Sequence, residues 1–215
     1  MPYQAVLFDM DGVLLDSEPL HYEATKRTWA RHGHHLTYDE YKRHFGGKTD
    51  KEGFTEYGKL VGMTTAAVRG LLAEKARAYQ AVAAGSAFQP CAGTLEYIDW
   101  LVTQGVPIAL VTGSLRAEAE LVLRAFRLEN AFSALVAAED VAHGKPHPEG
   151  YLKGAAALGV EPEACIVVED APSGIAAARS AGMRCIALTT TYDAGELTQA
   201  HHIVAQLRPG TLIPA

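Results

Sequence analysis

Two carboxylates spaced two residues apart follow a short apolar run near the start of the chain. Asp9 and Asp11 come directly after Ala5–Phe8, which is short enough to be a buried strand, and Gly12 permits a turn. If the strand geometry continues as far as Asp11, both carboxylates point to the same side, because the side-chain period of a strand is two. Such a pair can act as nucleophile and as general acid and base, although an isolated Asp-x-Asp-Gly is just as often a solvated turn.

Three later segments also place polar residues after apolar strands. They are Thr112-Gly113-Ser114, Gly144-Lys145-Pro146-His147-Pro148, and Glu169-Asp170 followed by Ala171-Pro172-Ser173-Gly174. Taken alone, Lys145 is a surface lysine, the hydroxyl residues are helix caps, and the acidic pair is a solvated loop. Because parallel strands end at one edge of a sheet, however, the four segments are expected to meet, which favours a common site.

The residue types at this edge predict phosphoryl chemistry. Two like charges about 4 Å apart repel by about 4 kcal/mol at an effective dielectric of 20, so the acids Asp9, Asp11, Glu169 and Asp170 require protons or a cation. An oxygen-rich site with few ligands suits Mg²⁺, which accepts phosphate oxygens. Lys145 adds a positive charge, and hydroxyl groups with nearby backbone N–H groups can bind phosphate.

The elements that position these residues follow from hydrophobic patterning. Residues 17–85 show helical spacing and few strand-like runs, so we expect a helical insertion. Ser17 is expected to cap its first helix, and Thr37 and Glu40 have capping-box spacing. One amphipathic helix is expected over 65–84, with apolar positions at Val68, Leu71, Leu72, Ala76, Tyr79 and Val82.

From residue 93 onward, apolar strands alternate with helices, which is typical of a parallel sheet covered on both faces. Strands are expected near 3–8, 107–112, 134–137, 165–168, 185–188 and 203–205, and helices over 116–126, 148–158 and 173–181. The predicted fold class is therefore α/β, a Rossmann-like parallel sheet core with an inserted α-helical cap. The core comprises 1–16 and 86–215, and the cap comprises 17–85.

Composition excludes several classes of function. Of the 215 residues, 48% are hydrophobic and 20% charged, and the net charge of −6 gives no footprint for nucleic acid or an anionic membrane. The three cysteines lack metal-ligand spacing and predict reduced thiols in a cytosolic protein, and no signal peptide or membrane span is evident. We expect a cytoplasmic monomer without nucleic-acid or membrane partners. The histidine groups at 32–35 and 201–202 are interpreted as exposed residues rather than a metal site.

The chain resembles haloacid dehalogenase-like hydrolases, in the branch that contains β-phosphoglucomutase and sugar phosphatases. Phe-Asp-Met-Asp-Gly-Val-Leu matches the first family motif, and the segments beginning at Val111, Gly144 and Glu169 match the other three. The resemblance implies a mobile cap, an aspartyl phosphate on Asp9, and Mg²⁺ bound by Asp9, the Asp11 carbonyl and Asp170 with Glu169 nearby. Because dehalogenases lack the second aspartate, the presence of Asp11 favours phosphoryl transfer.

The same resemblance implies a substrate-binding role for several cap residues. His21 matches a linker histidine, Lys75 matches a cap lysine, and the segment containing Gly47, Lys48 and Asp50 matches the substrate-specificity loop. Many relatives, the mutases among them, carry arginine where Asp50 falls. An ionised aspartate cannot donate hydrogen bonds to a distal phosphate, and a lysine lacks the bidentate fork of arginine.

The favoured function is a Mg²⁺-dependent phosphatase that hydrolyses a small phosphorylated metabolite, most simply a sugar phosphate. Asp9 would attack phosphorus, Asp11 would serve as acid and base, and Thr112, Gly113, Ser114 and Lys145 would hold the phosphoryl group. One alternative is a β-phosphoglucomutase-type phosphomutase. Another, from a different class, is a phosphoacceptor or binding module that does not turn over, against which Asp11 argues because a passive acceptor needs no acid–base partner.

Overall fold

The computed structural model describes residues 3–46, 50–85 and 88–211, and its internal contacts divide the chain into two compact units. The larger unit joins Met1–Asp16 to Gln89–Ala215, and the smaller unit spans Ser17–Phe88. Gly47 and Lys48, which the sequence suggests as substrate ligands, lie outside the described residues.

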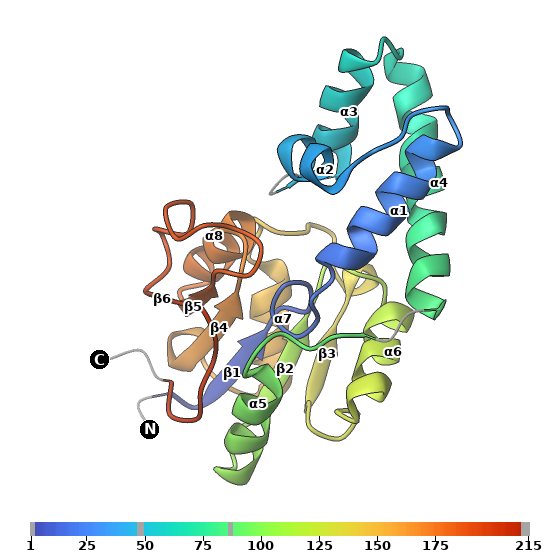
Figure 1. Cartoon of the computed structure of the whole chain (residues 1–215). Coiled ribbons are helices and arrows are strands. Elements are labelled where there is room, and N and C mark those ends of the chain that lie inside the picture. Colours follow the sequence, from blue (N-terminus) through green and yellow to red (C-terminus); the bar gives the residue numbers. More distant parts are fainter. Residues whose placement is uncertain (1–2, 47–49, 86–87, 212–215) are drawn as a thin grey trace. The chain divides into compact units, whose positions relative to one another are not determined.

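A parallel sheet of six strands, counted over the described residues, runs through the larger unit (Figure 1). The strands are β1 Ala5–Phe8, β2 Ile108–Val111, β3 Ala134–Val136, β4 Cys165–Glu169, β5 Arg184–Leu188 and β6 His202–Val204. Their order across the sheet is β3-β2-β1-β4-β5-β6. β1, β2 and β4 consist of buried residues throughout, as expected for a sheet covered on both faces. The predicted α/β fold class is confirmed.

Helices cover both faces of this sheet. They are α5 Thr94–Thr103, α6 Arg116–Phe126, α7 Glu149–Leu158 and α8 Pro172–Ser180, with short 3₁₀ turns at Ala138–Asp140 and Pro162–Ala164. Alternate residues of β1 face opposite ways, so Leu7 packs with the apolar side chains of α7 and α8. Phe8 faces the other side, where Tyr97 of α5 meets it edge-on with ring centroids 6.1 Å apart.

Strand register brings the predicted site residues together. Phe8 pairs with Leu110 of β2 and with Val168 of β4, so the residue after each strand end has a neighbour on the next strand. Asp9 therefore lies beside Glu169 at the carboxyl edge of the sheet, and its N–H donates to Val168 O at 3.0 Å. Chain order reverses here between β1 and β4, which is where open α/β sheets bind ligands.

The smaller unit is helical, as its sequence pattern predicts. Its helices are α1 Glu18–Ala30, α2 Tyr38–His44, α3 Asp50–Leu60 and α4 Thr65–Gly85. Trp29 is fully buried and stacks on Phe54 with centroids 5.4 Å apart, and six further residues complete this apolar cluster. The capping box of Thr37 and Glu40 is present. The predicted Ser17 cap is wrong, because the Ser17 backbone is already helical and its side chain makes no cap hydrogen bond.

The buried stripe of α4 differs in part from the predicted one. Val68, Leu71 and Val82 are buried as expected, whereas Ala76 is exposed and Leu72 and Tyr79 are half-buried. Lys75 and Ala78 complete the stripe instead. The observed positions follow the helical period more closely than the predicted ones, but one of them is a lysine, which a search for apolar residues passes over.

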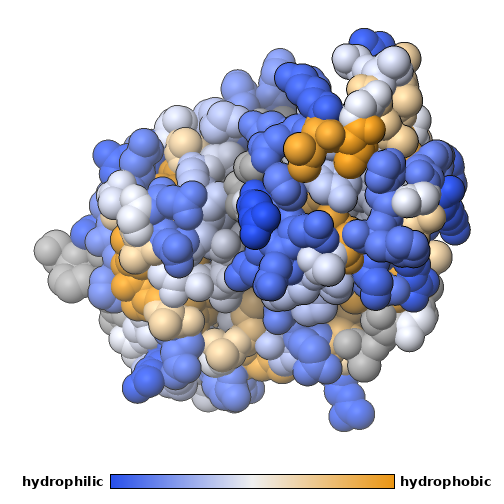
Figure 2. Space-filling model, turned by 45° about the horizontal axis from the view of Figure 1, so that its top comes forward, coloured by the Kyte–Doolittle hydropathy of each residue, from blue (hydrophilic) through white to orange (hydrophobic). Residues whose placement is uncertain are grey.

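The surface carries no large apolar feature on the face drawn in Figure 2, where hydrophilic residues predominate and apolar ones form separate patches. Within residues 3–46, 50–85 and 88–211, the exposed large apolar side chains belong to different elements and are Tyr38, Leu60, Val102, Leu115, Leu121 and Leu152. None of the helices in the described residues has the length and apolarity that a membrane crossing requires. The three cysteines, all of which are described, are buried and form no disulfide.

Candidate active site

An ion pair lies at the carboxyl edge of the central strand. The Lys145 ammonium is 2.7 Å from Asp9 Oδ1 and 2.7 Å from Glu169 Oε1, and it approaches Val111 O at 3.4 Å. Lys145 comes from the connection between β3 and α7, whereas Asp9 follows β1 and Glu169 ends β4. Segments that the sequence predicts to converge are therefore in direct contact.

Glu169 is fully buried and its carboxylate is saturated with donors. Among the described residues, Oε1 accepts from Lys145 Nζ and from the Tyr151 hydroxyl at 2.8 Å, and Oε2 accepts from the N–H groups of Asp170 and Ala171 at 2.9 and 3.0 Å. A Cβ on Gly174 would lie 1.6 Å from Oε1, so the first turn of α8 needs glycine there. Glu169 thus holds Lys145 and the loop after β4 in fixed positions.

Asp170 faces the loop that follows β1. It is 3% exposed, and a Cβ on Gly12 would lie 1.8 Å from its Oδ2. Gly12 also has a positive φ of 73°, which other residues rarely adopt. The glycine therefore turns the chain and lets the backbone approach the Asp170 carboxylate.

Asp11 is held by the segment that follows β2. Ser114 Oγ donates to Asp11 Oδ2 at 2.9 Å, while Oδ1 is buried and has no hydrogen-bond partner among the described residues. Thr112 Oγ1 accepts from Ser114 N at 3.0 Å. Asp11 does not continue the strand as predicted, because β1 ends at Phe8 and the chain turns directly after Asp11, where Gly12 N donates to Leu15 O at 2.8 Å.

Burial and mutual repulsion oppose the ionisation of Asp9 and Asp170. Burial raises the pKa of Asp9 to about 7, with Lys145 offsetting part of the effect and Glu169 and Asp11 adding to it. Burial, Glu169 and Asp9 raise the pKa of Asp170 to about 8. Burial alone would lower the pKa of Lys145, but Asp9 and Glu169 outweigh it, so its net pKa is raised and the ammonium stays charged. In the described part of the chain, Lys145 is the cation that pairs with Asp9 and Glu169, and it offsets only part of the effect of burial and of the neighbouring carboxylates.

The cap residues suggested by the sequence form their own cluster within the smaller unit. Lys75 is 3% exposed and its Nζ donates at 2.7 Å to both His21 Nδ1 and Asp50 Oδ2. The His21 ring stacks on Tyr79 with centroids 4.6 Å apart. Asp50, half-exposed, therefore fixes the Lys75 cation.

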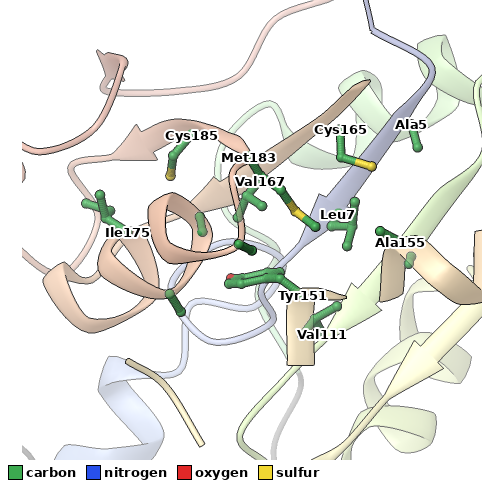
Figure 3. Close-up of a cluster of buried hydrophobic side chains, with 14 of the residues drawn as sticks. Ala5, Leu7, Val111, Tyr151, Ala155, Cys165, Val167, Ile175, Met183 and Cys185 are labelled. Carbon is green, nitrogen blue, oxygen red and sulfur yellow. The ribbon is translucent and has the colours of Figure 1, made fainter. Parts of the chain in front are cut away.

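Tyr151 is a site residue that the sequence analysis does not identify. It is 1% exposed in α7, and Figure 3 shows its ring in the apolar cluster beside Leu7 and Val111. Besides donating to Glu169, it places its ring under the Lys145 ammonium, 5.0 Å from the centroid. The signal available in the sequence is a tyrosine on the inner face of a helix rich in alanine and glycine, since a buried hydroxyl needs a partner.

Comparison with known proteins gives consistent matches over nearly the whole chain. The haloacid dehalogenase-like hydrolase profile matches residues 6–188. A validoxylamine A 7'-phosphate phosphatase from Streptomyces hygroscopicus subsp. limoneus is 39% identical, over 95% of this chain and 94% of the relative. A phosphorylated carbohydrates phosphatase from Thermotoga maritima is 31% identical, over 98% and 96%.

Solved structures agree with these sequence matches. The crystal structure of CbbY from Rhodobacter sphaeroides in complex with xylulose-(1,5)bisphosphate has a TM-score of 0.76 and 25% identity, covering 95% of this chain and 94% of that one. The relatives named as phosphatases support the predicted enzyme class, phosphoric monoester hydrolase. The chain belongs to the haloacid dehalogenase-like hydrolase family.

Proposed function

We propose that the chain is a Mg²⁺-dependent phosphatase that hydrolyses a small sugar phosphate through an aspartyl phosphate on Asp9. The observation that carries this proposal is the largely buried Asp9 carboxylate at the edge of the central strand, paired with Lys145 and crowded by other acids. The relative named as a phosphorylated carbohydrates phosphatase supports the substrate class.

The reaction divides into two displacements at phosphorus. Asp9 forms an oxygen–phosphorus bond as the bond to the leaving alcohol breaks, and Asp11 gives its proton to that alcohol oxygen. Asp11 then removes a proton from water, the water oxygen attacks phosphorus, and phosphate leaves Asp9. Ser114 positions Asp11 through Oδ2, while Oδ1, to which no described residue donates, can carry the proton.

The phosphoryl group is held by the segment after β2 and by Lys145. Thr112 Oγ1 uses a lone pair to accept from Ser114 N, so its own proton remains available for a phosphate oxygen. Lys145 is fixed beside the attacking carboxylate and neutralises charge on the transferring group. Thr112, Gly113 and Lys145 line one cavity of about 290 Å³.

The acidic cluster fits Mg²⁺ by its chemistry. Ligand oxygens of Asp9, Glu169 and Asp170 lie within 4.8 Å of one another. Burial, and after it the neighbouring carboxylates, raises the pKa of both aspartates, and a bound cation would offset this cost of ionisation. Because hydrogen bonds already occupy the lone pairs of Glu169, we propose Asp9, Asp170 and the Asp11 carbonyl as ligands and Glu169 as a positioning residue. Bound Mg²⁺ would neutralise carboxylate charge and charge that develops on the phosphoryl oxygens.

The cap cluster favours hydrolysis over mutase activity. A mutase must grip a second phosphate, and Asp50 presents an acceptor-only carboxylate that also engages Lys75. A half-exposed carboxylate can instead accept hydrogen bonds from sugar hydroxyls. The hydrogen bond that Ser114 donates to Asp11 argues against a passive phosphoacceptor, because such a protein does not need a positioned acid–base group.

A phosphate-release screen tests the proposal. Purified protein is assayed with sugar phosphates, phosphoglycolate, nucleotides and pyrophosphate, with and without EDTA, beside Asp9→Asn as control. We expect Mg²⁺-dependent release from a sugar phosphate and none from the variant. Release that persists in chelator-treated enzyme would refute the metal requirement. Isomerisation of β-glucose 1-phosphate with negligible phosphate release would replace the phosphatase by a mutase.

The buried thiols bear on the compartment. Burial raises the pKa of Cys91 to about 12 and that of Cys165 to about 11, so both remain protonated and unreactive. Unpaired cysteines of this kind persist in a reducing environment. We therefore propose a cytoplasmic location.

A further inference from the structure

A second group of potential metal ligands lies on the connection between β3 and α7. Within the described residues, ligand atoms of His143, His147 and Glu149 all lie within 4.8 Å of one another. His143 Nδ1 is 3.4 Å from Glu149 Oε2, and the two imidazole rings are tilted with centroids 4.7 Å apart. None of these three residues has a role in the hydrolytic reaction proposed above.

The carboxylate of this group is already positioned. Glu149 accepts from the N–H groups of Ala142 and His143 at 3.0 Å each, so the loop is fixed on its side chain. Ala142 N and Lys153 Nζ, the latter at 2.7 Å, occupy Oε1, whereas Oε2 accepts from one backbone N–H and keeps a second lone pair near His143 Nδ1. Supporting hydrogen bonds of this kind orient ligands and strengthen metal binding.

We propose that His143, His147 and Glu149 form a binding site for a transition-metal ion of the Zn²⁺ class, separate from the Mg²⁺ cluster. Two imidazoles and one carboxylate suit Zn²⁺, whereas Mg²⁺ prefers oxygen ligands alone. Tetrahedral ligands at about 2.1 Å lie about 3.4 Å apart, so modest side-chain rotation closes the site. The His143 side chain is 68% exposed and can make that rotation.

Binding has an identifiable structural cost. His147 Nδ1 accepts a hydrogen bond from Glu149 N at 3.3 Å, and a neutral imidazole has only one unprotonated nitrogen. Coordination by that nitrogen replaces the hydrogen bond, and coordination by the other requires the opposite tautomer. Either change alters the backbone contact at the start of α7.

The location of the site links it to catalysis. Lys145 lies midway between the two histidines in sequence, and His143 and His147 line the same cavity as Thr112 and Lys145. Coordination by His147 changes its contact with Glu149 N, and this alters the segment that presents Lys145 to Asp9. We therefore expect occupation of the site to lower turnover. This second part rests on the proposed phosphatase function, whereas metal binding itself does not.

Calorimetric titration of tag-free protein with ZnCl₂, in saturating Mg²⁺ to block the acidic cluster, tests the site. We expect one equivalent of Zn²⁺ to bind, and His143→Ala and His147→Ala each to weaken binding at least about tenfold. The matched control is a double variant, His32→Ala with His35→Ala, which removes two exposed histidines elsewhere and should bind Zn²⁺ like the parent protein. Equal affinity in the His143 and His147 variants would overturn the site.

Turnover measured in the same buffers tests the link to Lys145. Zn²⁺ should inhibit the parent protein and the control variant, and inhibition should require at least about tenfold more Zn²⁺ in His143→Ala. Stoichiometric binding without inhibition would support the site and refute its coupling to Lys145. A protein that binds Zn²⁺ but hydrolyses no phosphate ester would leave the site standing and refute the proposed phosphatase.

Discussion

Removal of one hydroxyl, by Tyr151→Phe, should weaken both the core and the reaction. The hydroxyl donates at 2.8 Å to Glu169, whose side chain is fully buried, so water cannot replace it. A hydrogen bond to a charged group contributes about 1.5–3 kcal/mol, and a loss of about 2 kcal/mol lowers the melting temperature by about 4–8 °C. The phenylalanine ring keeps the contact with the Lys145 ammonium, so the change isolates the hydrogen bond.

The catalytic effect follows from competition for Lys145. Without the hydroxyl, Glu169 Oε1 has lost one of its two donors and attracts the Lys145 ammonium more strongly, away from Asp9. If about 1 kcal/mol of this change reaches the transition state, kcat/KM falls about fivefold. Lys145 also lowers the pKa of Asp9, so the acid limb of the pH profile should move to higher pH.

The assay compares melting temperature, kcat/KM and its pH profile for the parent protein, Tyr151→Phe and Tyr97→Phe. Tyr97 is an equally buried tyrosine whose hydroxyl donates at 3.0 Å to Thr211 O, a neutral acceptor. We expect Tyr97→Phe to cost about 1 kcal/mol of stability without changing the pH profile. A Tyr151→Phe enzyme with parental kcat/KM and parental pH profile would refute the positioning role, whatever its stability.

Three further predictions concern the carboxylates. Because the folded-state pKa values of Asp9 and Asp170 (about 7 and about 8) exceed the unfolded value, the metal-free fold binds extra protons between about pH 4 and 8. The melting temperature in EDTA should therefore fall between pH 5 and pH 8.5, and it should fall less steeply in Asp9→Asn. Addition of Mg²⁺ should raise the melting temperature most at pH 8.5. A melting temperature that rises with pH in EDTA would contradict this prediction. Asp9→Asn should abolish turnover, and turnover by this variant would exclude Asp9 as nucleophile. Asp11→Asn should slow dephosphorylation, so that the acid-quenched protein shows the added mass of a phosphoryl group. Asp50→Arg should raise the affinity for bisphosphates relative to monophosphates, and it should lower stability because it removes the carboxylate that pairs with Lys75. Inhibition constants and melting curves test both effects, with Asp50→Asn as the control. Unchanged bisphosphate affinity would exclude a role of Asp50 in substrate choice.

Motif spacing and strand patterning predict that most residues of the candidate site lie at one edge of the sheet. Asp9, Thr112, Lys145 and Glu169 each follow or lie near the end of an apolar strand, and the topology of a parallel sheet brings such ends together. The contact between Lys145 and Glu169 is not predicted, because a strand pattern gives the edge on which a residue lies but not the partner of its side chain. The sequence accordingly places Glu169 only among the acids that a cation must neutralise, whereas in the structure its carboxylate already accepts four hydrogen bonds.

Buried polar residues are what sequence patterns capture least. Lys75 lies in the buried stripe of α4, where the helical period predicts apolar residues. Its hydrogen bonds to Asp50 and His21, which lie far from it in the cap sequence, offset the cost of burying its charge. Tyr151 likewise depends on a partner eighteen positions away. Their burial follows from tertiary pairing, which neither hydrophobic period nor local propensity encodes.

The chain leaves the core near Asp16 and returns to it near Gln89, and backbone hydrogen bonds join these two points. Asp16 N donates to Gln89 O at 2.9 Å and Cys91 N donates to Leu14 O at 3.1 Å, so the core holds both ends of the insertion side by side with its own backbone. These core contacts offset the entropic cost of bringing the two ends of the insertion together. That cost grows by only about 0.6 kcal/mol for each doubling of the length of the insertion. We therefore expect the core to tolerate segments of other length or fold between these two points with its strand order unchanged.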